Sequence, residues 1–222
     1  MIALISDIHG NFPALTSVLN KIDSLGISEI YCLGDIVGYY SQVNECCEML
    51  QKRDVKCIIG NHDWYMISKT NCPRSKSAND CLQYQSKIIK YKNLKWLEKL
   101  PIILQIGELS MVHTGWNNPL DEYLIDVNQN YFDLINSQYF ASGHTHIQSI
   151  KIFGSKMFCN PGSVGQPRDG NSQAAFATFD GTGFQLYRVD YDIDLTCKLM
   201  DEAGFDEYYY KRLRIGSENF FK

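Results

Sequence analysis

The stretch Ser6-Asp7-Ile8-His9-Gly10-Asn11 follows the first hydrophobic run of the chain. That run predicts a short buried strand over residues 1–6, and Asp7 and His9 come where it stops. Residues i and i+2 of an extended chain point to the same side, so the two side chains are expected to reach one point in space. A carboxylate and an imidazole placed in this way are half of a divalent-metal site, although they also form an ordinary hydrogen-bonded pair.

The next segments alternate between helix and strand. The spacing of apolar residues predicts helices over 12–24 and 42–53 and buried strands over 29–33 and 55–59. This β-α-β-α-β order predicts parallel strands joined by right-handed crossovers. The two later strands close with Gly34-Asp35 and with Gly60-Asn61-His62-Asp63. Ligands bind beyond the carboxyl ends of parallel strands, so these polar residues are expected to converge with Asp7 and His9.

The rest of the chain is less regular. Residues 73–100 read as a helical insertion over the edge of the site, and Gly107-Glu108 predicts a hairpin that ends at His113. Further along, we expect a short helix over 128–137, a strand over 139–142, four strands in a second, largely antiparallel sheet (148–153, 156–159, 174–180 and 184–190), and a helical tail over 192–222.

Composition bounds the class of protein. The 222 residues fit one domain, 1–222, with 45% hydrophobic and 21% charged residues, as in a soluble globular protein. The net charge of −4 argues against broad binding of nucleic acid. No targeting segment or membrane span is evident, and the eight cysteines lack C-x-x-C spacing. Reduced, mostly buried thiols in a cytoplasmic protein are therefore expected.

All five histidines of the chain follow predicted strands, and none lies in a predicted helix or in the tail. Any one of them taken singly is better explained as a structural or surface histidine. His144 and His146, after the strand at 139–142, repeat the i, i+2 spacing of Asp7 and His9, and Gly143 before them allows a close backbone approach. Together the five positions favour a shared site.

The candidate metal ligands are seven side chains: Asp7, His9, Asp35, Asn61, His113, His144 and His146. Asp35 also suits a turn, and Asn61 a left-handed turn position. Seven donors are more than one tetrahedral ion can bind, and they suit two ions bridged by a carboxylate. The oxygen and imidazole mixture favours Mn, Fe, Zn, Ni or Co over Mg or Ca. Two such ions about 3.5–4 Å apart clamp the attacking and leaving oxygens at phosphorus.

These blocks, in this order, resemble the calcineurin-like metallophosphoesterases: Asp7-Ile8-His9-Gly10-Asn11, Gly34-Asp35, Gly60-Asn61-His62-Asp63, His113 and Gly143-His144-Thr145-His146. The resemblance covers about residues 1–190. It implies an α/β fold, a four-layer α/β/β/α sandwich of the metallo-dependent phosphatase type. The stretches 32–39, 119–124 and 160–168 are similar to small prokaryotic phosphodiesterase-like members.

The resemblance also implies roles. Asp7, His9 and His146 would hold the first metal, and Asn61, His113 and His144 the second, with Asp35 as the bridge. His62 looks like the family's non-ligand histidine, which contacts phosphate and protonates the leaving oxygen, and Asn61 would assist it. Arg168 is a candidate for phosphate binding because a guanidinium suits such oxygens.

The resulting expectation is a dinuclear metal-dependent phosphoesterase, in which a metal-bridging hydroxide attacks a small phosphate ester in line. A phosphodiesterase is favoured on resemblance alone. A phosphomonoesterase, acting on proteins or nucleotides, and a non-catalytic scaffold of the same fold remain as alternatives. A nuclease would call for a basic groove, which the acidic balance does not favour. The sequence does not decide the oligomeric state.

Overall fold

The computed structural model describes residues 1–217. Its first sheet has the strand order β10-β9-β1-β2-β3. The first three strands in the chain, β1 (Ile2–Ile5), β2 (Ile30–Cys32) and β3 (Lys56–Cys57), are parallel, as predicted. The crossovers between them contain α1 (Phe12–Ser24) and α2 (Val43–Lys52). The carboxyl ends of all three strands therefore meet at one edge of this sheet.

The second sheet differs from the expectation. Its order is β4 (Ile103–Ile106), β5 (Leu109–Val112), β6 (Tyr139–Ala141), β8 (Lys156–Asn160) and β7 (Ser149–Phe153). The three central strands β5, β6 and β8 are parallel, so the sheet is mixed rather than largely antiparallel. The carboxyl ends of β5 and β6 can therefore supply ligands just as those of the first sheet do.

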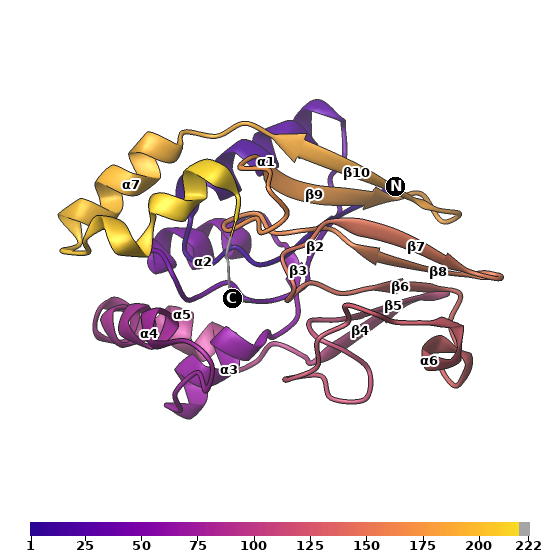
Figure 1. Ribbon diagram of the computed structural model, residues 1–222. Helices are drawn as coiled ribbons and strands as arrows, with labels where there is room; N and C mark the ends of the chain where they lie inside the picture. The colour runs from indigo at the N-terminus through magenta and orange to yellow at the C-terminus, as the bar shows by residue number, and fades with distance from the viewer. Residues whose placement is uncertain (218–222) are drawn as a thin grey trace.

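The last two predicted strands were also assigned to the wrong sheet. β9 (Ala174–Phe179) pairs antiparallel with β1, and β10 (Phe184–Val189) pairs with β9 (Figure 1). Apolar patterning predicts a strand but not its partner, and this partner lies more than 170 residues away in the chain. Both sheets consequently have five strands.

Three apolar clusters separate the layers, and the alternation along single strands shows how. Ala3 and Ile5 of β1 face the cluster shared with α1, α2 and the C-terminal helices, whereas Leu4 faces the cluster between the two sheets. On the far side of the second sheet, Phe140 and Phe158 pack against the short helix α6 (Gln129–Asp133). The α/β/β/α order expected from the resemblance is therefore present (Figure 1).

Other helices cover the edge where the strands end. α3 (Asn61–Ser68) begins directly after β3, although residues 60–63 were expected to be a loop. Its eight residues lack a clear helical stripe, and the turn is closed locally by Gly60 N–H donating to the Asp63 carboxylate at 2.9 Å. The insertion at 73–100 is two helices, α4 (Lys76–Ile88) and α5 (Tyr91–Leu97), separated by the extended Ile89.

The chain then ends in helical turns. α7 (Ile193–Glu202) is followed by two 3-10 segments, η1 (Glu207–Tyr209) and η2 (Lys211–Ile215). Met200 and Leu213 join the same apolar cluster as α1 and α2, so this segment is packed onto the first sheet's helical layer. Residues 218–222 of the expected helical tail lie outside the described residues.

Two further expectations concern composition. All eight cysteines are buried and unpaired, as expected. Within residues 1–217, none of the helices combines the length and apolarity needed to cross a bilayer.

Candidate metal centre

The structure brings all seven predicted ligands together. They come from the loops or helix that follow five strands: Asp7 and His9 after β1, Asp35 after β2, Asn61 after β3, His113 after β5, and His144 and His146 after β6. All seven are buried. Two clusters of donor atoms result, each with all its atoms within 4.8 Å of one another: Asp7, His9 and His146, and Asp35, His113 and His144.

In the first cluster the donor atoms face one another closely. His9 Nε2 lies 3.1 Å from His146 Nε2, and His146 Nε2 lies 3.2 Å from Asp7 Oδ1. Ligands bound at about 2.1 Å to one ion stand about 3.0–3.4 Å apart by simple geometry. Two of the three distances therefore already match a coordination shell, and the third, from His9 Nε2 to Asp7 Oδ1, is 4.0 Å.

The second cluster has similar spacing. His113 Nε2 lies 3.2 Å from Asp35 Oδ2 and 3.0 Å from the Asn61 side-chain oxygen. Asp35 Oδ2 is also 3.7 Å from His9 Nε2 of the first cluster. Asp35 Oδ2 thus faces both clusters, which is the arrangement that a bridging ligand requires. Asp7 Oδ1 does so slightly less closely, at 3.2 Å from His146 Nε2 and 3.9 Å from His113 Nε2.

An unsatisfied atom supports the fit of a cation. His144 Nε2 is buried and has no hydrogen-bond partner among the described residues. Buried polar atoms are almost always paired, and an orphan indicates strain, function or an absent ion. Because this nitrogen belongs to the second cluster, a metal ligand is the simplest role for it. The residues therefore fit a pair of divalent ions.

The backbone at the ligands is unusual, and it corrects the reasoning from extended strands. Asp7, His9, Asp35, His144 and His146 all have positive φ, between 52° and 66°. The pair Asp7/His9 and the pair His144/His146 therefore do not lie on extended chain. Their side chains converge because the left-handed residues turn each loop tightly, while Asp7 N–H and His9 N–H still bond to the carbonyls of Gly34 and Asp35 at 3.0 and 2.9 Å.

Left-handed conformation costs a non-glycine residue roughly 1 kcal/mol or more. Five such residues around one point are a concentrated strain, which is typical of functional sites. The hydrogen bonds of the loops offset it: the Asp7 carboxylate accepts from His144 N–H at 3.1 Å, and Asp35 Oδ1 accepts from His62 N–H at 2.8 Å.

Two glycines make room for the centre. A Cβ at Gly143 would come within 1.9 Å of Ser6 Oγ and 2.5 Å of Asp7 Oδ2. A Cβ at Gly38, where φ is +96°, would come within 2.6 Å of His62 Nδ1 and 3.2 Å of His9 Nδ1. At both positions the main chain approaches functional side chains too closely for any other residue.

The electrostatics of the centre favour a bound cation. Burial raises the pKa of Asp7 and Asp35, but His146 and His113 respectively, with other nearby imidazoles, outweigh it and hold both carboxyls below their usual range. Burial likewise lowers the pKa of His113, yet the negative Asp35 and Asp7 outweigh it and raise that pKa to about 10. A positive charge is thus strongly favoured between the two carboxylates.

Three further histidines, His9, His62 and His144, are held neutral. Burial drives the pKa of His9 and His144 well below the usual range and lowers the pKa of His62 to about 4. A neutral imidazole offers the lone pair that a metal needs. At neutral pH, His9 and His144 are therefore ready to act as ligands without first losing a proton.

Three of the four ligand rings are fixed from behind. The Nδ1 atoms of His9, His113 and His146 lie 2.9, 2.7 and 2.6 Å from the backbone carbonyls of Val37, Leu33 and Gln166. In a neutral imidazole, an Nδ1–H that donates to a carbonyl leaves Nε2 unprotonated and aimed at the centre. His113, whose pKa is raised, would lose its Nε2 proton when an ion binds. These contacts select the tautomer that binds metal.

Sequence reasoning did not assign a role to several residues that hold the site. Asp63 accepts from the N–H groups of Ile36 and Val37 at 2.9 and 3.0 Å, which ties the loop carrying Asp35 to α3. Burial, with the negative Asp35 nearby, raises the pKa of Asp63 to about 7. The position of Asp63 in the Gly60-Asn61-His62-Asp63 block was the sequence feature that could have indicated this role.

Two tyrosines and a glutamine also contact the centre or its loops. The Tyr39 ring packs 4.7 Å from His9 and 5.1 Å from His62, and the Tyr123 ring lies 4.0 Å from His144, between centroids. Gln85 of α4 is fully buried, and its amide bonds to the Gly38 N–H at 2.7 Å and to the Gly38 and Tyr40 carbonyls at 2.9 and 2.5 Å. No spacing pattern in the sequence pointed to Gln85.

Arg168 lies at the rim of the site. Its Nη2 donates to the Tyr39 hydroxyl at 3.1 Å, and its guanidinium lies 5.5 Å from the centroid of the Tyr39 ring. Gln166 Oε1 accepts from the same guanidinium. The structure therefore brings Arg168 next to a ring that touches two site histidines, and its role toward phosphate stays a prediction.

The sequence model of a protein family, the calcineurin-like phosphoesterase superfamily domain, matches residues 1–182. The chain belongs to this superfamily. It is therefore a member of a family of phosphoesterases, enzymes that depend on divalent metals. The fold and the two clusters of Asp and His side chains agree with that membership.

Individual relatives support the same conclusion. An uncharacterized protein of Methanocaldococcus jannaschii is 37% identical over 97% of this chain and 98% of its own length. The crystal structure of a metallophosphoesterase from Sphaerobacter thermophilus, 31% identical, superposes with a TM-score of 0.83 over 97% of this chain and 99% of that one. A symmetrical bis(5′-nucleosyl)-tetraphosphatase of Neisseria gonorrhoeae is 29% identical, but over only 50% of this chain and 42% of its own length.

Proposed function

We propose that this protein is a dinuclear metal-dependent phosphoesterase that acts on a small phosphodiester or phosphoanhydride. Asp7, His9 and His146 would hold one ion, and Asn61, His113 and His144 the other. Asp35 would bridge them. We further propose that residues 1–222 form one domain built around this centre.

One observation carries the proposal: Asp35 Oδ2 lies within 3.2 Å of His113 Nε2 and 3.7 Å of His9 Nε2, so a single carboxylate oxygen faces both clusters. Separate structural ion pairs would not require this sharing. When bound, a pair of ions supplies positive charge to the phosphate oxygens and makes an attacking water more acidic.

The protein's own residues would do the rest. His62 has a buried Nδ1 without a partner among the described residues, and its ring packs 4.9 Å from His9. At neutral pH this imidazole is neutral, so it can donate an N–H hydrogen bond to a phosphate oxygen, and it would protonate the leaving oxygen only after taking up a proton itself. Tyr39 packs against one side of this ring, which restricts how it can turn. Asn61, next to His62, is held at the start of α3.

A diester fits better than a monoester. A monoester carries an additional negative charge at neutral pH and favours additional cations at the reacting phosphate. The rim cation Arg168 is already bonded to Tyr39 and Gln166. The Neisseria relative is also named for a substrate in which phosphates link two nucleosides. A phosphomonoesterase is the second candidate because Arg168 lies beside Tyr39 and hence near His62.

The test uses protein treated with EDTA and reloaded with Mn, Ni, Co, Zn or Mg. Bis-p-nitrophenyl phosphate and p-nitrophenyl phosphate are assayed side by side. We expect metal-dependent hydrolysis of both esters, with the larger kcat/KM for the diester. A preference for the monoester would select the second candidate. Hydrolysis of neither, by protein that holds two ions, would favour a non-catalytic scaffold.

A further inference from the structure

A cavity of ≈ 150 Å³ opens beside the metal centre. One wall is the start of α4 with Arg74 before it, and another consists of residues of η1 and η2, from Tyr208 to Leu213. The floor includes Tyr39 and Gln166. Nothing in the proposed chemistry of the metal centre uses the two outer walls.

Two chains of side-chain contacts connect the cavity to the metal centre, although none of the seven ligands lines the cavity. On one side, Tyr39 touches both the cavity and the rings of His9 and His62. On the other side, the Arg74 guanidinium lies 5.4 Å from the centroid of the Tyr123 ring, and that ring lies 4.0 Å from His144. The lining of the cavity is therefore separated from the site histidines by single aromatic rings.

The charge of the walls is strongly one-sided. Arg74, Lys76 and Arg212 line the cavity, and no acidic residue does so within residues 1–217. Arg74 pairs with Asp121, but Lys76 and Arg212 form no ion pair with any described residue. The chain as a whole has a net charge of −4, so a cluster of three cations at this place is not a reflection of composition.

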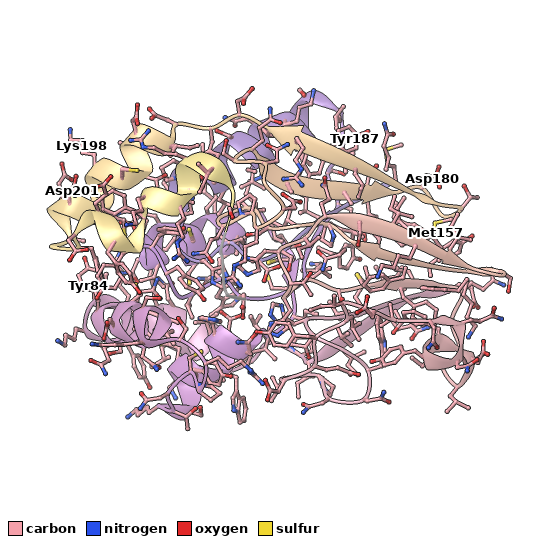
Figure 2. The ribbon with its side chains drawn as sticks, in the orientation of Figure 1. Tyr84, Met157, Asp180, Tyr187, Lys198 and Asp201 are labelled. Atoms are coloured by element: carbon pink, nitrogen blue, oxygen red, sulfur yellow. The ribbon has the colours of Figure 1, made fainter. Side chains whose placement is uncertain are left out.

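The two walls are braced against each other. The rings of Tyr84 on α4 and Phe205 before η1 pack edge to face at 5.1 Å, and the Tyr209 hydroxyl donates to Asp80 of α4 at 2.9 Å. Figure 2 shows Tyr84 pointing from α4 toward the C-terminal helices. The cations therefore stand on a fixed frame. Tyr208 at the rim is 60% exposed, which leaves its ring accessible from solvent.

We propose that this cavity binds phosphate groups that lie beyond the scissile phosphate, and that the substrate is a nucleoside polyphosphate whose base stacks on Tyr208. The inference rests on the proposed function and specifies its substrate class. Cationic side chains bind phosphate oxygens through charge-assisted hydrogen bonds. Exposed aromatic rings stack on nucleobases.

The size of the cavity agrees with phosphate groups inside it and a base at its rim. It is smaller than the roughly 300–1,000 Å³ of pockets that enclose a drug-sized ligand. A compact phosphate group or two would fill it, and the base would remain at the open rim. The Tyr39 ring, which lines the cavity and lies 5.1 Å from the His62 ring, would be the contact shared by the two parts of such a substrate.

The test is the double variant Lys76→Gln/Arg212→Gln, compared with Lys52→Gln/Lys99→Gln, which removes two exposed charges outside the cavity. With Mn-loaded protein, kcat/KM is measured for diadenosine tetraphosphate and for bis-p-nitrophenyl phosphate. We expect the ratio of the two values to fall at least about tenfold in the cavity variant, chiefly through KM, and by less than about twofold in the control.

A second arm does not depend on catalysis. Tripolyphosphate binding is measured by calorimetry in EDTA, where only the protein's own cations can attract it. The Kd should rise at least about tenfold in the cavity variant and stay within about twofold in the control. Thermal unfolding verifies that the variants are folded.

The outcomes separate the two proposals. Hydrolysis of bis-p-nitrophenyl phosphate with an unchanged ratio and unchanged tripolyphosphate binding would overturn the cavity proposal and leave the phosphoesterase intact. Hydrolysis of neither substrate, with two ions bound, would overturn the proposed function. Tighter binding of a single-stranded oligonucleotide than of diadenosine tetraphosphate would also contradict the proposal, by favouring a polynucleotide ligand.

Discussion

The metal centre and the cavity beside it are built in opposite ways. At the centre every ligand is buried, five of seven have left-handed backbones, and three ligand rings are fixed by backbone carbonyls. In the cavity the cations are exposed and Lys76 and Arg212 are held by no ion pair with a described residue. The difference suggests that the fold specifies the chemistry rigidly, whereas recognition of the rest of the substrate lies in residues that can change at little structural cost.

The largest effect is expected from Asp35→Asn. The bridging position would lose its charge, so both ions should bind more weakly together, and kcat/KM should fall by more than the roughly 10–100-fold that removal of an outer partner of a ligand costs. Metal content by elemental analysis and activity are measured in parallel.

The control for that variant is Asp180→Asn, in the turn between β9 and β10 at the opposite end of β1 from the centre (labelled in Figure 2). It should keep two ions and full activity. Two tightly held ions in Asp35→Asn would remove Asp35 from the bridging position.

The next effect concerns His62, whose side chain is not among the predicted ligands. His62→Gln should hold two ions, because the donor set is complete without it, while kcat falls roughly 10²–10⁴-fold as expected for loss of a general acid. Steady-state kinetics and elemental analysis on the same sample decide. Unchanged turnover would exclude His62 from the mechanism.

A smaller effect is expected from Gln85, which connects α4 to the loop that carries Tyr39. Gln85→Leu removes three hydrogen bonds to backbone groups of Gly38 and Tyr40, so the free energy of unfolding should drop by about 2–4 kcal/mol. Denaturant unfolding measures it, with the exposed Gln83→Leu on the same helix as the control. Equal stability of the two variants would show that the hydrogen bonds of Gln85 do not stabilise the fold.

The smallest effect belongs to the cavity rim. Tyr208→Ala should raise KM for diadenosine tetraphosphate by about fivefold, near the lower end of base stacking because the ring is 60% exposed, and should leave the metal content at two. An equal rise for bis-p-nitrophenyl phosphate, which has no nucleobase, would argue against stacking at this ring.

Much of the site could be predicted from the sequence because its ligands follow apolar runs. Runs of apolar residues predict the strands before Asp7, Asp35 and Asn61. Because parallel strands end at a common edge, the residues after them are expected to meet. The reasoning was wrong about the local geometry, since φ at Asp7 and His144 is positive and an apolar pattern carries no information on it.

Pairing over long separations was also beyond the sequence. β9 lies next to β1, and β5, β6 and β8 are parallel, which apolar patterns cannot distinguish from an antiparallel sheet. Gln85 and the cavity depend on which helix packs over which loop. Those contacts exist only after the chain has folded, so no spacing rule could point to them.

The central claim is that two ions share one carboxylate at this edge of the sheets. Anomalous diffraction at the manganese edge, from crystals of protein stripped with EDTA and reloaded with Mn, tests it most directly. We expect two peaks about 3.5–4 Å apart, one beside Asp7, His9 and His146, the other beside Asn61, His113 and His144, with Asp35 between them. A single peak, or peaks away from these side chains, would contradict the account.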